Sequence, residues 1–526
     1  MSASGPRPSR RPYPTHPLHY FLVLSAARLP DKVAVYDGSR AMTYRQLLDA
    51  STRLASSLHA LGVGKGDRVA LMAFNCLEVV IAFNGISMAG AVVSPLNPSY
   101  RQKEAAHQLA DSSAKMLIAQ ASLLDVARDA MRDAPNVQRL VAIGAAPDAG
   151  ILTFADLLDK GSSQPPHVSI DPARDLMALP YSSGTTGLPK GVMLSHANLV
   201  TNLSQYLGVG GAGAPREDDT FLACLPLFHI YGMNLVMNAA IARGATLVVM
   251  PRFDLDKAVA LIRRHRVTML HLVPPMVLTL NQCPDAALAG LSSVRVAYSG
   301  AAPLSGELQE LLEARAGIRC AQAYGLTETS PLDNADFAEP DRQRRGSVGP
   351  PLPDTEEKVV DLETGERELP PGEVGELVIR GPQVMRGYWN NPEATARMIR
   401  NGWLHTGDIA RMDADGWVYV VDRMKDLIKY KGFQVAPAEL EAALLEHPAV
   451  QDAAVIGKPD AEAGEVPKAF VVAKSAVTAA DLQAHIEARL AHFKRIREVE
   501  FVAEIPKSPS GKILRRVLLD RERSKQ

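Results

Sequence analysis

The sequence has few cysteines, and they are spread widely along the chain. Four occur in 526 residues, at positions 76, 224, 283 and 320, and none stands in a C-x-x-C pair. We therefore expect neither a disulfide framework nor a zinc site of the usual spacing. Separate free thiols are typical of a reducing compartment, so the cysteine pattern predicts a cytoplasmic protein.

The sequence also lacks an excess of charge and a long hydrophobic run. Lys and Arg number 57 against 58 Asp and Glu, which gives a formal net charge of −1. No overall charge attracts nucleic acid or an anionic membrane. No stretch reaches the roughly 18 uninterrupted apolar residues of a membrane span. The most apolar candidate, residues 69–95, carries Asn75, Glu78 and Asn84 and predicts a strand followed by a buried helix.

The N-terminus only faintly imitates a secretory signal. Three arginines precede an apolar run over residues 20–27, but that run is shorter than a normal signal core, and five prolines between Pro6 and Pro17 interrupt the approach. We interpret residues 1–17 as a disordered tail.

Most of the chain alternates between strand and helix signals, which predicts an α/β, multidomain protein. Thr43 and Gln46 form a capping box ahead of a helix with leucines on one face. Residues 33–143 and 246–315 repeat the β/α rhythm, so we expect two packed, largely parallel sheets. Prolines and short alternating strands after residue 345 predict a β-barrel-like subdomain. A small α+β unit follows, and we place the domains at 18–422 and 423–526.

The densest functional signal lies at residues 181–196, which read Tyr-Ser-Ser-Gly-Thr-Thr-Gly-Leu-Pro-Lys-Gly-Val-Met-Leu-Ser-His. Glycines let backbone N–H groups form an anion nest, and Lys190 adds a positive charge, so the loop suits a polyphosphate. It is not the common P-loop, because Pro189 precedes Lys190 and Gly191 follows. A bare Gly/Ser/Thr run would by itself favour an ordinary surface loop.

Four further strings carry polar groups that each have an ordinary explanation in isolation. Residues 322–329 contain Tyr324 and Glu328, residues 403–408 end on Asp408, residues 422–434 are basic, and residues 506–515 contain Lys512. A buried tyrosine, a turn aspartate and a solvated lysine would each be the simpler interpretation.

Taken together, in this order and spacing, the five strings resemble the adenylate-forming superfamily of acyl-CoA synthetases, peptide-synthetase adenylation domains and luciferases. The resemblance spans roughly residues 25–520. Within the superfamily, the residues at 225–232 and 429–441 are similar to those of the branch of fatty acyl-CoA synthetases and 4-coumarate–CoA ligases. It implies a carboxylic acid–CoA ligase that uses ATP, Mg²⁺ and CoA: an acyl-AMP forms with release of pyrophosphate, and CoA then takes the acyl group. It also implies an AMP-binding domain followed by a mobile lid domain.

The resemblance also implies residue roles. The catalytic set would be Thr327, Glu328 (the Mg²⁺ ligand), His229, Lys429, Gln434 and Lys512. ATP and AMP would contact Ser182, Ser183, Gly184, Thr185, Thr186, Lys190, Ser299, Gly300, Ala301, Ala302, Gln322, Tyr324, Gly325, Thr327, Asp408, Arg423 and Lys512. The acyl wall would be Phe228, His229, Tyr231, Ala301, Gly325, Pro331 and Leu332. CoA would pass Lys431, Gly432 and Phe433, and Lys425 would be the hinge.

Several alternatives stay open at this point. An amino-acid-activating enzyme would need an acid near His229 to hold an ammonium, and none is there. A non-catalytic homologue would be expected to lack Lys190, Glu328, Asp408 or Lys512, and all four are present. A carrier-protein acceptor and a homodimer are both compatible with the resemblance.

Small Ala301 and Gly325 would leave a deep slot in the acyl wall, which suits an alkyl chain or a flat aryl-propenoate about equally. Because the wall carries few groups that could bind a phenol hydroxyl, we expect a medium- or long-chain fatty acid first and a 4-coumarate-like aryl acid second.

Overall fold

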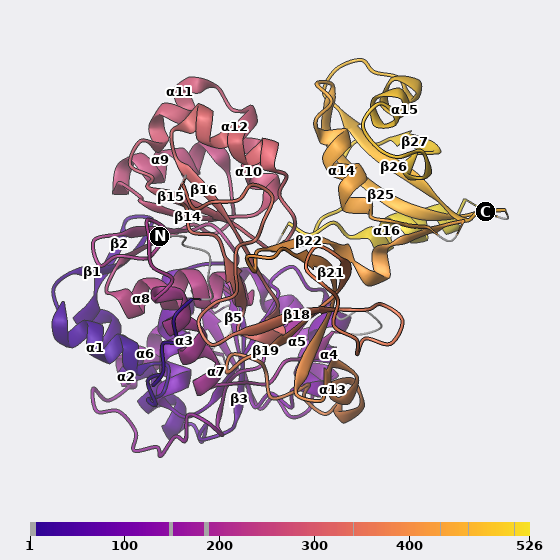
Figure 1. Ribbon diagram of the computed structural model, residues 1–526. Coiled ribbons are helices and arrows are strands. Elements are labelled where there is room, and N and C mark those ends of the chain that lie inside the picture. Colours follow the sequence, from indigo (N-terminus) through magenta and orange to yellow (C-terminus); the bar gives the residue numbers. More distant parts are fainter. Residues whose placement is uncertain are drawn as a thin grey trace.

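The computed structural model describes residues 7–146, 151–182, 189–339, 341–431, 433–460, 462–509 and 511–525. A large N-terminal body holds two sheets and a smaller antiparallel subdomain, and a small C-terminal domain stands beside it (Figure 1). The predicted α/β, multidomain architecture is confirmed.

Within the described residues, the first sheet has eight strands in the order β17-β16-β15-β14-β12-β13-β1-β2. The inner pairs are parallel, and β2 and β17 run antiparallel to their neighbours. The strands are β1 (Val33–Asp37), β2 (Arg40–Thr43), β12 (Thr220–Ala223), β13 (Thr246–Val249), β14 (Met269–Leu272), β15 (Val296–Ser299), β16 (Arg319–Gly325) and β17 (Leu332–Ala335).

The second sheet, in the same part of the chain, has the order β11-β8-β4-β3-β5-β6-β7, with only β11 antiparallel. Its strands are β3 (Arg68–Met72), β4 (Val92–Leu96), β5 (Met116–Gln120), β6 (Arg139–Ile143), β7 (Leu152–Thr153), β8 (Leu176–Ala178) and β11 (Leu194–Ser195).

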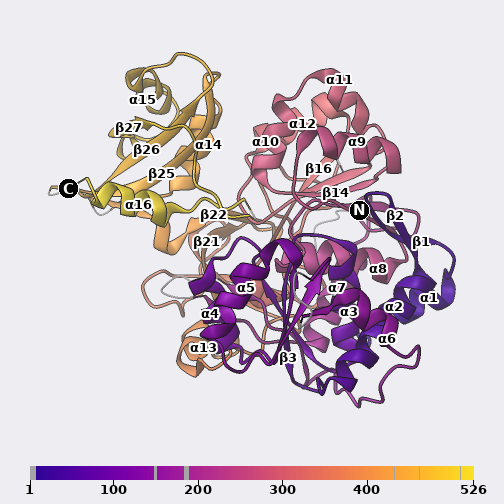
Figure 2. The same cartoon turned by 180° about the vertical axis from the view of Figure 1, so that it is seen from behind.

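Helices pack between the two sheets and over their outer faces. The helices of the large body are α1 (Tyr20–Arg28), α2 (Tyr44–Ala60), α3 (Leu77–Met88), α4 (Gln102–Asp111), α5 (Leu124–Arg132), α6 (Phe154–Lys160), α7 (His196–Leu207), α8 (Ala239–Arg243), α9 (Leu255–His265), α10 (Pro274–Gln282), α11 (Asp285–Leu288), α12 (Gly306–Ala316) and α13 (Pro392–Met398). Helix α3 is buried at every residue except Glu78 and contacts β1 of one sheet and β3 and β4 of the other. Helices α4 and α5 cover the second sheet on the side seen in Figure 2.

Local sequence signals account for the bounds of several helices. The predicted capping box is present at α2, where the Thr43 hydroxyl accepts from the Gln46 N–H and the Gln46 side chain accepts from the Thr43 N–H. Asp254 caps α9 at its start, and Arg266 ends that helix in the left-handed conformation. Helix α9 lies within residues 246–315, where the sequence predicted alternating strands and helices.

The antiparallel subdomain and the small α+β domain lie after residue 345, where the sequence predicted them. The subdomain contains β18 (Glu356–Val360), β19 (Val374–Arg380), β20 (Ile399–Arg400), β21 (Trp403–Met412) and β22 (Val418–Arg423). The small domain contains β23 (Ile428–Tyr430), β24 (Phe433–Val435), β25 (Val450–Asp460), β26 (Gly464–Ala473), β27 (Glu498–Phe501), α14 (Pro437–Leu445), α15 (Ala479–Glu487) and α16 (Arg515–Arg523). It has its own hydrophobic core around Ile428, Leu444 and Phe493.

The expectation of a disordered tail over residues 1–17 is wrong for residues 7–17. The Arg7 guanidinium donates to the carbonyls of Pro350 (3.0 Å) and Ala335 (2.6 Å), and it is almost fully buried. The Tyr13 hydroxyl donates to Asp354 at 2.5 Å. Composition alone suggested disorder, but these polar groups find partners more than 300 residues away in the sequence.

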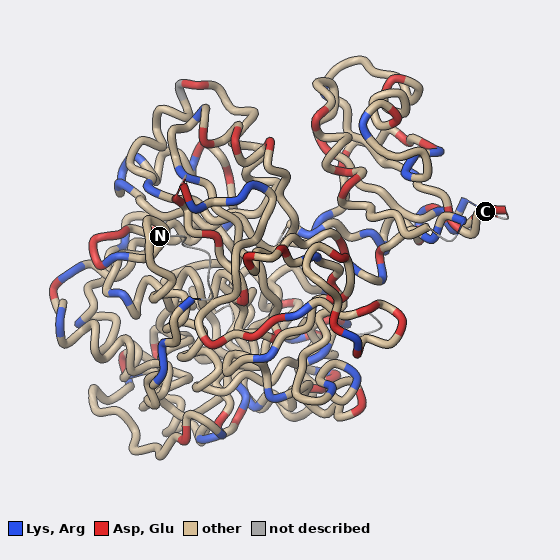
Figure 3. Tube along the Cα trace, viewed as in Figure 1, with Lys and Arg blue, Asp and Glu red and all other residues tan. Residues whose placement is uncertain are grey.

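Charge is distributed as the composition indicates. Basic and acidic residues are interspersed along the traces of both domains (Figure 3). None of the helices in the described part of the chain combines the length and the apolar character that a membrane crossing requires.

One buried side chain, Asn75, joins the two large sheets where their strands end. It lies after β3 of the second sheet, and its amide donates to the carbonyls of Ala223, Leu225 and Met250, which follow or end strands of the first sheet. Its oxygen accepts from the Leu227 N–H at 2.7 Å. Asn75 thereby fixes the loop that leads into the predicted acyl wall.

We predict that Asn75→Leu lowers the free energy of unfolding by about 3 kcal/mol or more, because buried backbone groups lose their partners at about 1–3 kcal/mol each. Denaturant unfolding is the measurement. Asn84→Leu is the matched control, since Asn84 is equally buried but donates only within its own helix, to Val80. Equal losses in the two variants would contradict a linking role for Asn75.

Candidate functional site

The predicted phosphate loop is carried by two short strands, β9 (Tyr181–Ser182) and β10 (Lys190–Gly191). They pair antiparallel, and Lys190 stands opposite Ser182. The predicted residues Ser183, Gly184, Thr185 and Thr186 lie outside the described residues. Its two stems therefore place the Ser182 hydroxyl and the Lys190 ammonium on adjacent strands.

The Glu328 carboxylate faces these stems. Glu328 lies with Thr327 in a short helical turn, η4 (Thr327–Thr329), and is 6% exposed. Its Oε1 atom accepts from the Ser182 hydroxyl at 2.9 Å and from the Tyr388 hydroxyl at 2.8 Å. None of the ion pairs among the described residues includes Glu328, and both donors to its side chain are hydroxyl groups.

This donor set fits Mg²⁺ bound together with a phosphate. Mg²⁺ favours one or two carboxylates plus substrate phosphates over an all-protein cage. The described residues contain no group of three or more His, Cys, Asp or Glu side chains that could hold a metal alone. Glu328 beside a phosphate loop therefore suits a cation that arrives with a nucleotide.

Asp408 lies at a junction of three elements. Its Oδ2 atom accepts from the Tyr324 hydroxyl at the end of β16, at 2.7 Å. Its Oδ1 atom pairs with the Arg423 guanidinium at 3.3 Å, and Arg423 is the residue opposite it on β22. Both predicted nucleotide side chains, Tyr324 and Arg423, therefore meet at this one carboxylate.

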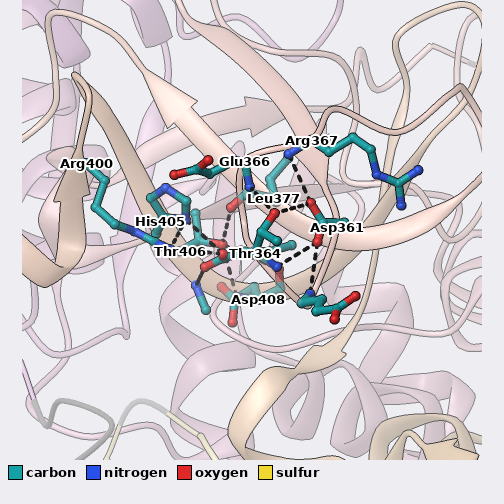
Figure 4. Close-up of polar contacts among 12 residues, drawn as sticks. Asp361, Thr364, Glu366, Arg367, Leu377, Arg400, His405, Thr406 and Asp408 are labelled. Atoms are coloured by element: carbon teal, nitrogen blue, oxygen red, sulfur yellow. Dashed lines mark hydrogen bonds and ion pairs between the residues drawn. The ribbon is translucent and has the colours of Figure 1, made fainter.

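The backbone beneath Asp408 is held by buried polar side chains (Figure 4). The Thr406 hydroxyl donates to the Leu377 carbonyl at 2.6 Å and accepts from the Asp408 N–H at 3.0 Å. His405 Nδ1 lies 2.8 Å from Glu376, whose other oxygen accepts from the Gly407 N–H. This turn fixes the carboxylate before any ligand binds.

Lys512 reaches the same region from the small domain. A Cβ atom at Gly511 would lie 2.8 Å from Val273, directly before α10, so the turn packs against the large body. Burial, followed by the Arg423 charge, lowers the pKa of Lys512 to about 8. The charges of Asp408 and Glu328 oppose that shift, which places the ammonium among the residues predicted to bind phosphate and ribose.

His229 and Tyr231 begin the predicted acyl wall. Burial and the Lys512 charge lower the pKa of His229 to about 3, so its ring is neutral at physiological pH. The Tyr231 N–H donates to His229 Nδ1 at 3.3 Å, which leaves the proton on Nε2. Tyr231 also starts a π-helix, η2 (Tyr231–Asn238), a rare element that often marks functional sites.

Gly325 was predicted to leave open space in the acyl wall, but the structure leaves none there. A Cβ atom there would lie 1.7 Å from the Pro331 carbonyl oxygen, so the missing side chain is already used by backbone packing between β16 and β17. At Gly300 a Cβ atom would lie 3.1 Å from the Tyr231 ring. Ala301 has a left-handed φ of 70°. Phe228 is half-buried and Leu332 is buried.

Two predicted nucleotide residues have side chains buried beside the wall. Both ends of the Gln322 amide have protein partners, since its oxygen accepts from the Leu304 N–H and its nitrogen donates to Gln309. Gln322 therefore supports β16 from within. The Ser299 hydroxyl, at the end of β15, is buried without a described partner, and Ala302 is half-buried three residues later.

The predicted CoA segment is not gathered into this site. Lys429, Lys431, Phe433 and Gln434 are all exposed on the β23–β24 hairpin, and no hydrogen bond or ion pair among the described residues joins them to Glu328 or Asp408. Gly432 lies outside the described residues. Phe433 is 52% exposed and stacks on Phe493 at 4.6 Å between ring centres.

The predicted hinge residue, Lys425, lies in the short turn η5 (Met424–Asp426) between β22 and the small domain. Asp422, before this turn, accepts from the Ala438 N–H at the start of α14, at 2.8 Å.

Some residues placed here were absent from the sequence prediction. Tyr388 contacts Glu328, and His271 lies 3.3 Å from the Tyr231 hydroxyl. A Gly-Tyr-Trp string at 387–389 was the only signal for Tyr388, and His271 stands within an ordinary buried strand.

The family comparisons agree with this geometry. The family model described as "AMP-binding enzyme" matches residues 22–389, and that described as "AMP-binding enzyme C-terminal domain" matches residues 439–512. Among curated proteins, 4-coumarate–CoA ligase 2 of Solanum tuberosum is 42% identical over 96% of this chain and 94% of its own. A 4-coumarate–CoA ligase of Pinus taeda is 41% identical, with 96% and 95% covered.

Solved structures agree with the curated relatives. An anthranilate CoA ligase in complex with anthranoyl-AMP superposes with a TM-score of 0.91 at 30% identity, covering 97% of this chain and 98% of its own. The o-succinylbenzoate CoA synthetase of Bacillus subtilis, bound to its acyl-adenylate, has a TM-score of 0.82 at 31% identity, with 96% and 98% covered. The chain therefore belongs to the adenylate-forming family of AMP-binding enzymes, among its AMP-forming CoA ligases, which use ATP, Mg²⁺ and CoA.

Proposed function

We propose that this enzyme activates an aromatic carboxylic acid, a hydroxycinnamate such as 4-coumarate, and transfers it to CoA. The observation that carries the proposal is the 42% identity to a 4-coumarate–CoA ligase over 96% of the chain. A second support is the similarity to a ligase of anthranilate, another aromatic acid. The preference therefore reverses the order drawn from the sequence, where a fatty acid came first.

The acyl wall supports the same choice. The fatty-acid preference rested on the small number of groups in the predicted wall that could bind a phenol. The slot expected at Ala301 and Gly325 suited both kinds of acid about equally, and at Gly325 the Pro331 carbonyl fills it. The Tyr231 hydroxyl lies 3.3 Å from both the Tyr298 carbonyl and His271 Nδ1. Burial lowers the pKa of His271 to about 3, so a neutral polar pair stands there.

Charge governs the first step, in which a carboxylate oxygen attacks the α-phosphorus of ATP and pyrophosphate leaves. Two anions must approach each other, so we assign Lys190 to the departing phosphates and Lys512 to the carboxylate and α-phosphate. Thr327 would donate to the α-phosphate. Glu328 would hold Mg²⁺, which offsets phosphate charge when bound. No covalent enzyme nucleophile is needed.

We assign the nucleoside to the Asp408 junction. Asp408 would accept from the ribose hydroxyls beside Arg423, and the Tyr324 ring would stack on adenine. The Tyr324–Asp408 hydrogen bond then fixes the ring and the carboxylate relative to each other. Gly300 and Ala302 would form the opposite wall.

The second step, attack of the CoA thiolate on the acyl-AMP carbonyl with loss of AMP, needs the other face of the small domain. Lys512 contributes charge at the site while the β23–β24 hairpin is exposed. We propose that the small domain rotates about Lys425, which withdraws Lys512 and brings Lys429 and Gln434 to the adenylate. Lys431, Gly432 and Phe433 would then border CoA.

We propose a cytoplasmic location and CoA as the acceptor. The four cysteines are free thiols in the structure, which suits a reducing compartment. The two curated relatives described above are CoA ligases.

Lys512→Ala is expected to lower adenylate formation by about 10²–10³, as removal of a charge-stabilising donor does. Thioester formation from supplied acyl-AMP and CoA should be nearly unchanged, because the lysine has by then withdrawn. Pyrophosphate exchange and single-turnover thioester assays measure the two steps. Equal losses in both would contradict domain rotation.

The fall of kcat/KM for adenylate formation at alkaline pH should reflect loss of the Lys512 proton. Its ammonium is charged below a pKa of about 8 and loses the proton above it, so kcat/KM should fall by up to about tenfold per pH unit beyond that value. Lys512→Arg keeps the charge and should move the limb to higher pH, whatever its absolute rate. Superimposable limbs in the two proteins would assign the ionisation to another group.

Substrate preference is tested by kcat/KM for 4-coumarate, cinnamate, octanoate and dodecanoate. We expect 4-coumarate to exceed both alkanoates by about tenfold or more, and the alkanoates to differ little. A fatty-acid enzyme would instead gain about 0.8 kcal/mol for each added buried methylene.

Tyr231→Phe provides the internal control for that comparison. It keeps the ring and removes the hydroxyl, so the advantage of 4-coumarate over cinnamate should shrink while cinnamate itself is little affected. An unchanged ratio would place the phenol elsewhere.

A further inference from the structure

Tyr388 links the two charged groups that flank the phosphate loop. Its hydroxyl donates to Glu328 Oε1 at 2.8 Å. The Lys190 ammonium lies 5.2 Å from the centre of its ring, within the range of a cation–π contact. One side chain therefore touches both the carboxylate that fits Mg²⁺ and the lysine at the exit of the loop.

The segment around Tyr388 is fastened on both sides. Along the loop exit, Tyr388 bridges Val192, and the Trp389 N–H donates to the Gly191 carbonyl at 2.8 Å. Toward the carboxylate, the Met385 N–H donates to the Glu328 carbonyl at 2.7 Å. This segment, residues 385–389, is therefore attached by backbone hydrogen bonds to both of the elements that it joins.

The Tyr388 ring itself is also fixed. Tyr388 is 5% exposed, and its N–H donates to the Thr395 hydroxyl at 2.8 Å. A buried ring with a held backbone loses little entropy in keeping one orientation. The phenol can therefore hold a charged neighbour in place without reorganisation when a ligand arrives.

The geometry at Glu328 explains why a donor here matters. Ser182 and Tyr388 both donate to Oε1, and no described residue donates to Oε2. Two donors on one oxygen fix the plane of the carboxylate and leave the other oxygen for a cation. A phenol keeps its proton at neutral pH, so the Tyr388 hydroxyl remains a donor.

We propose that Tyr388 is a positioning residue for the nucleotide: its hydroxyl orients the Glu328 carboxylate for Mg²⁺, and its ring orients Lys190 toward the phosphates. The proposal rests on the roles given above to Glu328 and Lys190. It assigns no proton transfer and no bond-making step to Tyr388.

Calorimetric binding of ATP in the absence of any carboxylic acid tests this without turnover. Affinity is measured once with Mg²⁺ and once with a chelator, and the ratio is the gain due to Mg²⁺. In Tyr388→Phe we expect that gain to fall by about tenfold, as for loss of a hydrogen bond to a charged group. The affinity for ATP in the presence of the chelator should stay within about twofold of that of the unmodified protein, because the ring still faces Lys190. An undiminished gain would overturn the proposal.

Tyr388→Leu separates the two halves of the proposal. It removes the ring as well as the hydroxyl, so affinity for ATP in chelator should fall in addition to the gain due to Mg²⁺. If Tyr388→Leu matches Tyr388→Phe in both measurements, the ring does not position Lys190, and that half of the proposal is wrong.

Tyr44→Phe is the matched control for loss of a buried hydroxyl. Tyr44 is fully buried, and its hydroxyl donates to the Ala245 carbonyl at 2.6 Å, in the body of the fold. It should lose thermal stability comparable to Tyr388→Phe while keeping the full gain due to Mg²⁺. A reduced gain in Tyr44→Phe would mean that lost stability explains both variants and would overturn the proposal.

Glu328→Gln distinguishes failure of this proposal from failure of the assigned function. If Glu328→Gln loses the gain and Tyr388→Phe keeps it, only the role of Tyr388 is wrong. If Glu328→Gln itself keeps the gain, the metal assignment fails and the proposal falls with it. Loss of the gain in both variants supports the proposal.

Discussion

The Asp408 carboxylate is the contact on which the arrangement of this enzyme depends. One oxygen accepts from Tyr324, at the end of the first sheet, and the other pairs with Arg423, directly before the hinge turn. Thr406 holds its backbone within the antiparallel subdomain. A single group thus sets the distance between sheet, subdomain and hinge. Because Asp408 is buried and paired, a ribose bound there would also have a fixed position relative to the small domain that follows Arg423.

Sequence reasoning succeeded where the signal is local and the chemistry belongs to a short string. The α2 capping box needs only Thr43 and Gln46, three residues apart. Three charged residues chosen from separate strings behave similarly. Glu328, Asp408 and Lys512 do interact electrostatically, although they come from different elements, because each motif lies at a strand end or turn that the fold directs to one place.

Sequence reasoning failed where a role is defined by what packs against a residue. Gly325 was interpreted as space for substrate, yet the Pro331 carbonyl occupies it, and no local pattern encodes that approach. Arg7 was placed in a disordered tail because its partners, Pro350 and Ala335, are remote in sequence. Tyr388 was missed for the same reason. An aromatic side chain in a loop usually belongs to the hydrophobic core, and only the neighbouring Glu328 carboxylate and Lys190 ammonium give this one another role.

Two polar contacts at the boundary of the small domain bear on the proposed rotation. Asp422 accepts from the Ala438 N–H, and Arg515, three residues after Lys512, lies 3.7 Å from Asp426 in the hinge turn. Arg515 is otherwise satisfied within the small domain by both oxygens of Glu441. The proposed rotation would exchange the hydrogen bond from the Ala438 N–H to the Asp422 carboxylate and one long ion pair for water contacts, at a cost of about 1–2 kcal/mol for these two contacts. A free-energy difference of that size is small enough for bound ligands to decide which face of the domain meets the site, so under the proposed mechanism adenylate formation would favour withdrawal of Lys512.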